Sequence, residues 1–380
     1  MKFESLLIHG GIDGDASTGA VNVPIYQTST FKKSEFENTK DNVYEYSRTG
    51  NPTRAALEKL ITELEEGYAG FAFASGMAAT TAALSLFKTG DKILISNNVY
   101  GGTFRVLDKY FKNFGLNYSV FDSSNIDELK NNIDDSVKAI FIETPTNPLM
   151  GITDIEEVAK IAKENNIISI VDNTFMTPYL QKPITLGADI VIHSATKYLG
   201  GHSDLVAGLV VVNNNELAER IHFIQNSTGG VLSPFDSFLL IKGIKTLALR
   251  MDRQNSNTTV VAKFLRGRKE VEKVYYPGFV DHPGHEIQTK QAKGYGGIIS
   301  FVLKEGYDYK KFLESLELIT FGESLGGVES LICHPATMTH AAIPYEMRQA
   351  IGITDNLIRI SVGIENVDDI VEDLIKSLEI

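Results

Sequence analysis

Three short apolar runs of this 380-residue chain end in polar residues that could carry out chemistry. The run GFAFA leads into Ser75-Gly76-Met77, NIISIVD closes with Asp172, and ADIVIH leads into SATK at residues 194–197. Taken singly, these stretches have ordinary structural interpretations: a capped helix start, a turn residue and a surface lysine. Their chemical interpretation is more specific. A serine–glycine turn offers N–H groups to a phosphate, a buried carboxylate attracts a cation, and a lysine amine can form a Schiff base.

Together the three stretches match the requirements of pyridoxal phosphate. The amides of residues 76–77 and the hydroxyls of Ser194 and Thr196 could hold its phosphate, and Lys197 could bind its aldehyde. Asp172 could keep the ring nitrogen protonated, which makes the ring an electron sink for a substrate carbanion. The strand–helix pattern alone also allows a dinucleotide-binding oxidoreductase. The first strand–helix turn, however, lacks the GxGxxG fingerprint and the acidic residue that should follow it.

These side chains can meet only if the apolar runs are strands of one sheet. Six runs are predicted strands: GFAFA, DKILIS, KAIFIE, NIISIVD, ADIVIHS and AGLVVV. Helical patterns precede or separate several of them, namely ALEKLITELEEG, GTFRVLDKYFKNFG and TDIEEVAKIAKENN. This alternation predicts an α/β fold with a mostly parallel sheet and helices on both faces. Ligands of such sheets bind beyond the carboxyl ends of the strands, where all three polar stretches fall.

The pattern changes on either side of this region. From about Pro234 a long helical run, residues 235–265, leads into GGIISFVL, a helix, NLIRISVG and a final helix. That order predicts a smaller α+β domain. The first residues are turn-rich and weakly periodic. We therefore expect an N-terminal arm at residues 1–55, a large cofactor-binding domain at 56–243 and a C-terminal α+β domain at 244–380.

Composition argues against several functional classes. The net charge of −12 argues against nucleic acids and anionic membranes as partners, and the single cysteine, Cys333, excludes a disulfide framework and a cysteine-rich metal site. No apolar run approaches the ~18–20 residues of a membrane span, and the first residues lack a signal-peptide core. These features predict a cytoplasmic protein. The segment HPGHE, residues 282–286, is interpreted as a polar loop, and Cys333-His334 as core or loop rather than a nucleophilic pair.

From about Leu7 to the C-terminus, the chain resembles the transsulfuration family of fold-type-I pyridoxal-phosphate enzymes. The motifs that carry the resemblance are SATKYLGGHSD, VDNTF, ETPTNP, ASGMAA, YSRTGNPTR, VYGGT and ESLGGVESL. It implies an aspartate-aminotransferase-like fold with a seven-stranded central sheet. It also implies that Lys197 is the Schiff-base lysine and that Asp172 pairs with the pyridine nitrogen. The remaining implied cofactor contacts are Gly76, Met77, Ser194 and Thr196 at the phosphate, Tyr100 stacked on the ring, and Asn147 near the 3′-oxygen.

The resemblance also assigns residues of the arm and of the C-terminal domain. Tyr46 and Arg48 lie two apart, so both side chains point the same way in an extended segment. By themselves they are more typical of a surface turn. In the family the equivalent pair reaches the neighbouring subunit's site, which implies a homotetramer, a dimer of dimers with shared active sites. Arg359 is implied to bind the substrate α-carboxylate, and Ser324 to shape the same region; Asn147 and Tyr46 also border the substrate.

Two positions narrow the expected reaction within the family. Methionine γ-lyases generally carry Cys where this chain has Gly102. Glu323 is shared with γ-lyases and γ-synthases, whereas β-lyases tend to have an aromatic residue at that position. A carboxylate at the pocket mouth could attract the distal ammonium group of cystathionine. The resemblance therefore implies the γ-lyase reaction, from L-cystathionine to cysteine, 2-oxobutanoate and ammonia. The alternative is γ-synthase activity, which joins an O-acylhomoserine to cysteine; methionine γ-lyase and cystathionine β-lyase activities fit less well.

Overall fold

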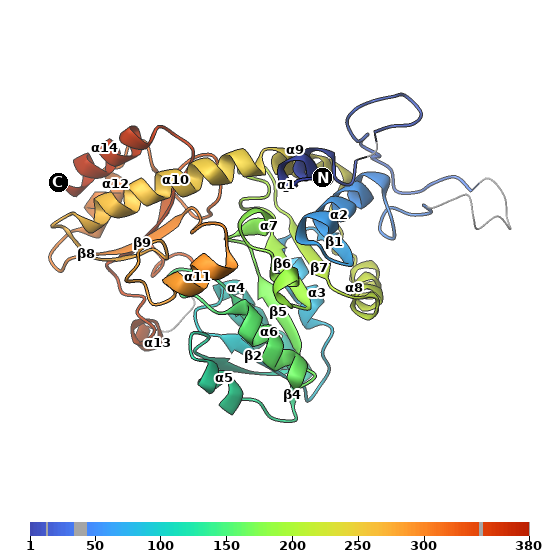
Figure 1. The fold of residues 1–380 in the computed structure, drawn as a ribbon, viewed down its shortest axis with the longest axis horizontal. Helices are drawn as coiled ribbons and strands as arrows, with labels where there is room; N and C mark the ends of the chain where they lie inside the picture. Colours follow the sequence, from blue (N-terminus) through green and yellow to red (C-terminus); the bar gives the residue numbers. More distant parts are fainter. Residues whose placement is uncertain (13, 34–43, 342–344, 380) are drawn as a thin grey trace.

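The computed structural model describes residues 1–12, 14–33, 44–341 and 345–379 (Figure 1). These residues form a seven-stranded sheet in the order β1-β7-β6-β5-β4-β2-β3. Its strands are β1 (Ala69–Phe73), β2 (Lys92–Ser96), β3 (Asn117–Phe121), β4 (Val137–Glu143), β5 (Ile168–Asp172), β6 (Ile190–Ser194) and β7 (Gly208–Val212). Strand β7 runs antiparallel to both of its neighbours and the other pairs are parallel. The predicted mostly parallel α/β sheet is confirmed.

The edge strand β3 was not among the predicted strands. Its sequence, NYSVF, is half exposed and ends at the buried Phe121, so it lacks the continuous apolar run that marks its neighbours. The helices of this region are α2 (Pro52–Glu65), α3 (Gly76–Leu84), α4 (Gly101–Lys109), α5 (Ile126–Asn131), α6 (Ile155–Glu164), α7 (Thr177–Leu180), α8 (Asn215–Thr228) and α9 (Pro234–Lys245). Two 3₁₀ turns, Phe111–Phe114 and Pro183–Leu186, complete it.

Alternation along the strands divides the helices between the two faces of the sheet. Ile93, Ile170 and Ile192 point toward α3, α4 and α8, whereas Leu94 and Val171 point toward the opposite face, which α2 and α6 cover. Successive residues of one strand therefore belong to different cores. The same alternation decides on which face each polar residue at a strand end lies.

The C-terminal part contains a second, five-stranded sheet among the described residues. Its order is β10-β11-β12-β9-β8. The strands are β8 (Val271–Tyr275), β9 (Ile298–Leu303), β10 (Thr320–Phe321), β11 (Leu331–Cys333) and β12 (Leu357–Ser361). The helices are α10 (Leu247–Arg266), α11 (His285–Gln291), α12 (Tyr309–Glu314), α13 (Tyr345–Ala350) and α14 (Val367–Leu378). This smaller unit has the expected α+β character (Figure 1). The predicted runs GGIISFVL and NLIRISVG supply β9 and β12.

The long helical run predicted for residues 235–265 is wrong in one respect, because it is two helices. Helix α9 ends at Lys245 and α10 begins at Leu247, with Thr246 between them in a non-helical conformation. The Thr246 hydroxyl and the guanidinium of Arg250 both donate to the carbonyl of Gly243. That carbonyl lies in the last turn of α9 and also accepts the Thr246 amide at 3.2 Å, so side chains and backbone together cap the break.

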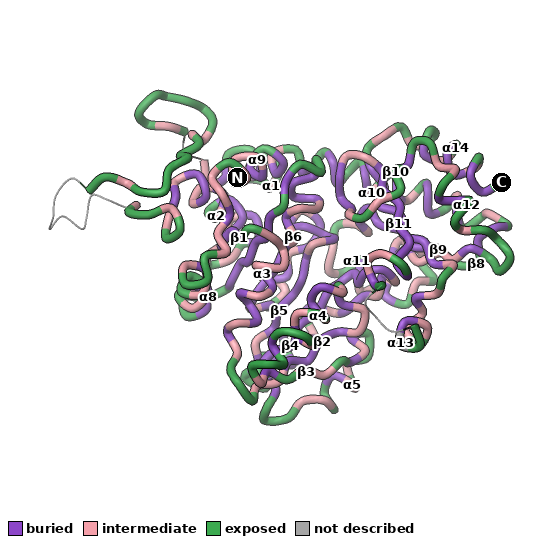
Figure 2. Tube along the Cα trace, turned by 180° about the vertical axis from the view of Figure 1, so that it is seen from behind, coloured by how far each residue is buried: buried purple, intermediate pink, exposed green. Residues whose placement is uncertain are grey.

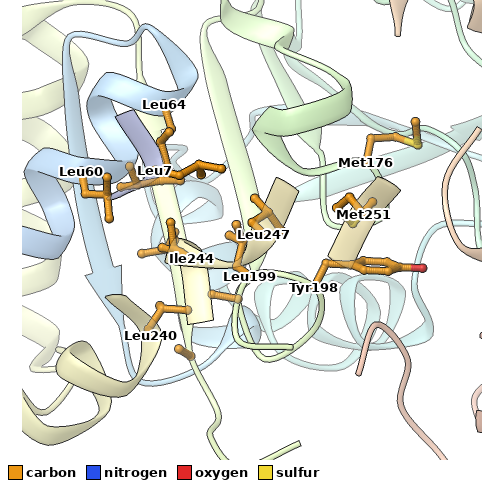
Figure 3. Close-up of a cluster of buried hydrophobic side chains, with 14 of the residues drawn as sticks. Leu7, Leu60, Leu64, Met176, Tyr198, Leu199, Leu240, Ile244, Leu247 and Met251 are labelled. Carbon is orange, nitrogen blue, oxygen red and sulfur yellow. The ribbon is translucent and has the colours of Figure 1, made fainter. Parts of the chain in front are cut away.

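A large hydrophobic cluster joins α2, α9 and α10 to the loop after β6. Figure 3 shows part of it, including Leu60 and Leu64 of α2, Ile244 of α9, Met251 of α10 and Tyr198. Tyr198 is fully buried and directly follows Lys197. The backbone that carries the lysine is therefore fixed in the core.

The N-terminal residues do not all lie in an extended segment. Helix α1 (Phe3–His9) buries Leu7 in the cluster shown in Figure 3, whereas much of the chain before α2 is exposed and projects from the body (Figure 2). Residues 34–43 of the predicted arm lie outside the described residues, and the predicted domain limits stay a prediction. No helix within the described ranges is long and apolar enough to span a membrane.

Candidate active site

The polar stretches at the ends of β1, β5 and β6 line one pocket of about 260 Å³. Twelve of the residues singled out in the sequence contribute to it: Ser75, Gly76, Met77, Tyr100, Asn147, Asp172, Ser194, Thr196, Lys197, Glu323, Ser324 and Arg359. Other lining residues escaped the sequence reasoning: Thr80, Glu143, Thr174, Phe175, Ile192, Val206, Leu325 and Thr339. Both sheets contribute, since Arg359 lies on β12 and the residues up to Val206 come from the large sheet and its loops.

The first turn of α3 forms one end of the pocket. The Ser75 hydroxyl accepts a hydrogen bond from the Ala78 amide, which caps the helix, while the amides of Gly76 and Met77 have no hydrogen-bond partner among the described residues. A Cβ at Gly76 would lie 2.8 Å from both Cβ and Oγ of Ser194, so only glycine allows this approach. The result is a cradle of N–H and hydroxyl groups at a helix N-terminus, which suits a phosphate.

Asp172 lies at the carboxyl end of β5 with its side chain largely buried. Its Oδ1 accepts hydrogen bonds from the amide of Thr174 at 3.0 Å and from the Thr174 hydroxyl at 2.5 Å. Oδ2 has no hydrogen-bond partner among the described residues and so remains available to a donor in the pocket. Burial raises the pKa of Asp172, and the hydrogen bonds from Thr174 oppose that rise.

Glu143 is the acidic residue that the sequence reasoning missed. It pairs in register with Asp172 on the neighbouring strand, and its carboxylate accepts the amide of Tyr100 at 2.7 Å and the amide of Asn147 at 3.1 Å. It thereby holds two loops that border the pocket. Burial, and then the charge of Asp172, raise the pKa of Glu143 well above its usual range. The signal was present, because Glu143 closes the run KAIFIE as Asp172 closes NIISIVD.

Lys197 extends into the pocket toward the C-terminal part of the chain. Its Nζ donates a hydrogen bond of 2.8 Å to the hydroxyl of Ser324. Burial, and then the positive charge of Arg359, lower the pKa of Lys197 from 10.5 to about 8. An amine with this pKa is partly neutral near neutral pH and can act as a nucleophile and a base.

Arg359 is a buried cation in the middle of β12, with only 2% of its surface exposed. Its Nη1 donates to Oδ1 of Asn147 and its Nη2 to the carbonyl of Ser324, each at 2.9 Å. Neither partner is an anion, so the guanidinium charge is left for an anionic ligand. Glu323 lies nearby at the exposed mouth of the pocket, and Tyr100, 42% exposed, borders it as well.

Tyr46 and Arg48 do not line this pocket. Arg48 donates to the backbone carbonyl and to the side-chain oxygen of Asn226 on α8, and its guanidinium lies 5.6 Å from the centre of the Tyr46 ring. Both residues stand on the surface of the single chain. Their predicted role in a neighbouring subunit's site therefore stays a prediction.

The remaining candidates lie outside this pocket. The prediction of a polar loop for HPGHE is only partly right, because its last two residues, His285 and Glu286, begin helix α11. No group of three metal-ligating side chains occurs among the described residues. Cys333 is buried, which raises the pKa of its thiol. The ring of His334 is bound through Nδ1 to Thr337 and through Nε2 to the carbonyl of Asp355, so it does not form a pair with Cys333.

This donor set fits pyridoxal phosphate. The cradle at α3 accepts a phosphate, the free Oδ2 of Asp172 accepts an N–H, and Lys197 supplies an amine within the same pocket. When bound, the cofactor supplies an electron sink that stabilises negative charge at a substrate Cα. A mostly parallel seven-stranded sheet, a second smaller sheet and this site together define a fold-type-I pyridoxal-phosphate enzyme.

Comparisons with known proteins identify the family within this class of enzymes. The profile of the Cys/Met metabolism PLP-dependent enzymes matches residues 4–379, and the chain belongs to this family. It is 57% identical to a cystathionine beta-lyase of Lactococcus lactis subsp. cremoris, across 100% of this chain and 99% of the relative. It is 56% identical to a cystathionine gamma-lyase of Bacillus subtilis, across the full length of both. The crystal structure of cystathionine gamma-lyase from Lactobacillus plantarum complexed with L-serine superposes with a TM-score of 0.98 at 51% identity, covering 100% and 99% of the two chains.

Proposed function

We propose that the enzyme catalyses the α,γ-elimination of L-cystathionine, in which water is consumed and cysteine, 2-oxobutanoate and ammonia are released. The observation that carries this choice is the arrangement of charge around the pocket. A buried cation, Arg359, faces the inside and an exposed carboxylate, Glu323, stands at the mouth. Cystathionine carries an α-carboxylate beside the reacting carbon and a second ammonium group at its far end. The two protein charges complement these two substrate charges.

Each polar residue then has one task. Arg359 binds the α-carboxylate and thereby fixes the position of Cα. Lys197, whose pKa of about 8 leaves a share of the amine neutral, takes the Cα proton and returns protons later in the reaction. Asp172 supplies the negative charge that stabilises a protonated ring nitrogen, and Tyr100 covers the ring. Gly76, Met77, Ser194 and Thr196 hold the phosphate.

Relatives of nearly equal identity bear the names beta-lyase and gamma-lyase, so the position of bond cleavage needs a direct test. The purified enzyme, loaded with cofactor, is incubated with L-cystathionine and the keto acids are separated by chromatography. We expect 2-oxobutanoate and cysteine in equal amounts. Pyruvate and homocysteine as the main products would assign β-elimination instead. Lys197→Ala serves as the control and should form neither keto acid.

The γ-synthase reaction is tested with the same protein. Cysteine and an O-acylhomoserine are supplied together, and cystathionine formation is compared with its breakdown. We expect breakdown to dominate; because Glu323 complements the distal ammonium of cystathionine as substrate and as product alike, the ratio of the two rates decides between the activities. Faster synthesis than breakdown would assign the γ-synthase activity. A tetramer with shared sites and a cytoplasmic location are further proposals, supported only by the family resemblance and by the sequence features given above.

A further inference from the structure

One acidic side chain inside the pocket has no task in the proposed reaction. Glu143, the last residue of β4, lines the pocket with only 5% of its surface exposed. Its Oε2 accepts the amide of Tyr100 at 2.7 Å, and its Oε1 accepts the amide of Asn147 at 3.1 Å. A buried carboxyl group is unfavourable unless its oxygens find donors, and here each oxygen has one. Glu143 therefore bridges two segments of the pocket wall.

The backbone that carries this bridge belongs to the central sheet. Glu143 pairs in register with Asp172 of β5, and its own amide donates to the hydroxyl of Ser96 at the end of β2. The two oxygens of one carboxyl group lie at a fixed separation, and each can accept a hydrogen bond whether or not the group is ionised. The two amides are thus held at a set distance from each other and from the sheet.

Tyr100 is the residue at which the chain enters α4. Within the described ranges its amide has no hydrogen-bond partner other than Glu143, and its side chain does not cap the helix. Its ring lies against the first turn of α4, since a Cβ at Gly102 would be 2.4 Å from Cε1 of the ring. The Glu143 contact and the packing on Gly102 therefore set the direction in which the ring leaves the backbone.

Asn147 connects the same carboxyl group to the cation of the pocket. Its amide is bonded to Glu143, and its Oδ1 accepts from Nη1 of Arg359 at 2.9 Å. The second guanidinium contact is the carbonyl of Ser324, so Arg359 is oriented by two neutral acceptors. Two consecutive hydrogen bonds thus lead from Glu143 through Asn147 to the guanidinium. A shift of the Asn147 loop would remove one of the two groups that orient it.

We propose that Glu143 is a positioning residue that holds Tyr100 against the cofactor ring and the Arg359 guanidinium at the substrate carboxylate as one unit. Glu143 then neither transfers a proton nor contacts the substrate. This role rests on the tasks given to Tyr100 and Arg359 in the proposed function. An electrostatic effect of Glu143 on Asp172 and Arg359, which line the same pocket, is the alternative that an experiment must separate.

The test uses the cofactor-loaded enzyme and two binding measurements. Visible circular dichroism of the bound cofactor reports the surroundings of its ring, because the free cofactor gives no such signal. The dissociation constant of glycine, followed by the change in visible absorbance, reports the carboxylate site without turnover, since glycine has no side chain to eliminate. Both are measured at one pH for the wild type, Glu143→Asp and Glu143→Gln.

The two variants separate the bridge from the charge. Aspartate keeps the charge but is one methylene too short to reach both amides, whereas glutamine keeps one acceptor and turns an NH₂ group toward the other amide. We expect Glu143→Asp to reduce the circular dichroism signal and to weaken glycine binding roughly five- to tenfold, the size of one lost hydrogen bond. Glu143→Gln should change at least one of the two measurements.

Three results would overturn the role of Glu143. Wild-type behaviour of Glu143→Asp beside an impaired Glu143→Gln would mean that only the charge matters. A change of Glu143→Asp in one measurement alone would mean that the two contacts do not act as a unit. Wild-type values in both folded variants would mean that neither contact matters. If Glu143→Gln does not fold, Glu143→Asp decides alone, and wild-type values for it overturn the role.

Reference variants separate this inference from a structural effect and from the roles on which it rests. Asp373→Asn alters another buried carboxylate, which accepts the amides of residues 317–319, and should lower stability without changing either measurement. Equal changes in this control would show a merely structural effect. Glycine binding at wild-type strength in Arg359→Met would refute the task of Arg359, and an unchanged circular dichroism signal in Tyr100→Leu that of Tyr100, rather than the role of Glu143.

Discussion

Lys197 should destabilise the folded protein whenever the cofactor is absent. Its ammonium group is largely buried, its one hydrogen-bond partner among the described residues is the neutral hydroxyl of Ser324, and the Arg359 cation acts on it across the pocket. A buried lysine with these neighbours is retained for chemistry at the expense of stability. Replacing it by methionine, which has a similar length and no charge, should therefore stabilise the cofactor-free protein.

The size of the effect follows from the pKa. A folded-state value of about 8 against 10.5 in the unfolded chain corresponds to at most about 3 kcal/mol. Because the folded pKa is the lower one, this destabilisation is fully present below pH 8. It is lost as the pH rises from 8 to 10.5, where the amine is neutral in both states. The hydrogen bond to Ser324, which methionine cannot make, offsets about 1 kcal/mol. The net gain should be about 2 kcal/mol at pH 7.

Thermal unfolding of the cofactor-free wild type and of Lys197→Met, compared at pH 7 and at pH 10, measures this difference. We expect the variant to unfold at a temperature several degrees higher at pH 7, and the two curves to converge at pH 10. Lys88→Met is the matched control, because it makes the same replacement at an exposed position. Equal stability of Lys197→Met and wild type at pH 7, or a gain that does not shrink with pH, would refute the burial argument.

Two further predictions concern the neighbouring subunit and the substrate. Arg48→Ala should weaken cofactor affinity, and mixing it with Lys197→Ala should recover part of the activity through hybrid sites; no recovery in verified mixed oligomers would contradict shared sites. Glu323→Ala should raise KM for cystathionine several-fold, because it removes the partner of the distal ammonium. It should leave KM for homocysteine, which lacks that group, nearly unchanged, and equal losses for the two substrates would contradict the role given to Glu323.

Much of the large sheet could be predicted because its strands are buried on both faces. Continuous apolar runs such as NIISIVD and AGLVVV are typical of such strands, and six of the seven in the described sheet were found this way. The edge strand β3 has no such run. The break between α9 and α10 was not predicted either, because it depends on contacts to the carbonyl of Gly243 rather than on helix propensity.

The candidate site was predictable to the extent that its residues stand at strand ends. Choosing the polar residues at or just after the ends of apolar runs selects Asp172 and Lys197. The same choice at the end of KAIFIE selects Glu143, which also lines the pocket. The buried contact of 2.6 Å between Nε2 of His193 and Oε1 of Glu65 could not be predicted in this way. His193 lies inside an apolar run and reads as part of a strand, and its partner is 128 residues away, so only the three-dimensional structure connects them.

Ser324 forms hydrogen bonds with both cations of the pocket, Lys197 and Arg359. Its hydroxyl accepts from Lys197 and its carbonyl from Arg359, and its backbone has a φ of 103°, a conformation that is strained for any residue except glycine. The charge of Arg359 is one of the influences that lower the pKa of Lys197. A carboxylate bound to Arg359 offsets that charge, so the pKa of Lys197 rises again once substrate is in place. The lowered pKa thus leaves a share of the amine neutral and nucleophilic in the free site, and the amine becomes a stronger base when the substrate carboxylate has been bound.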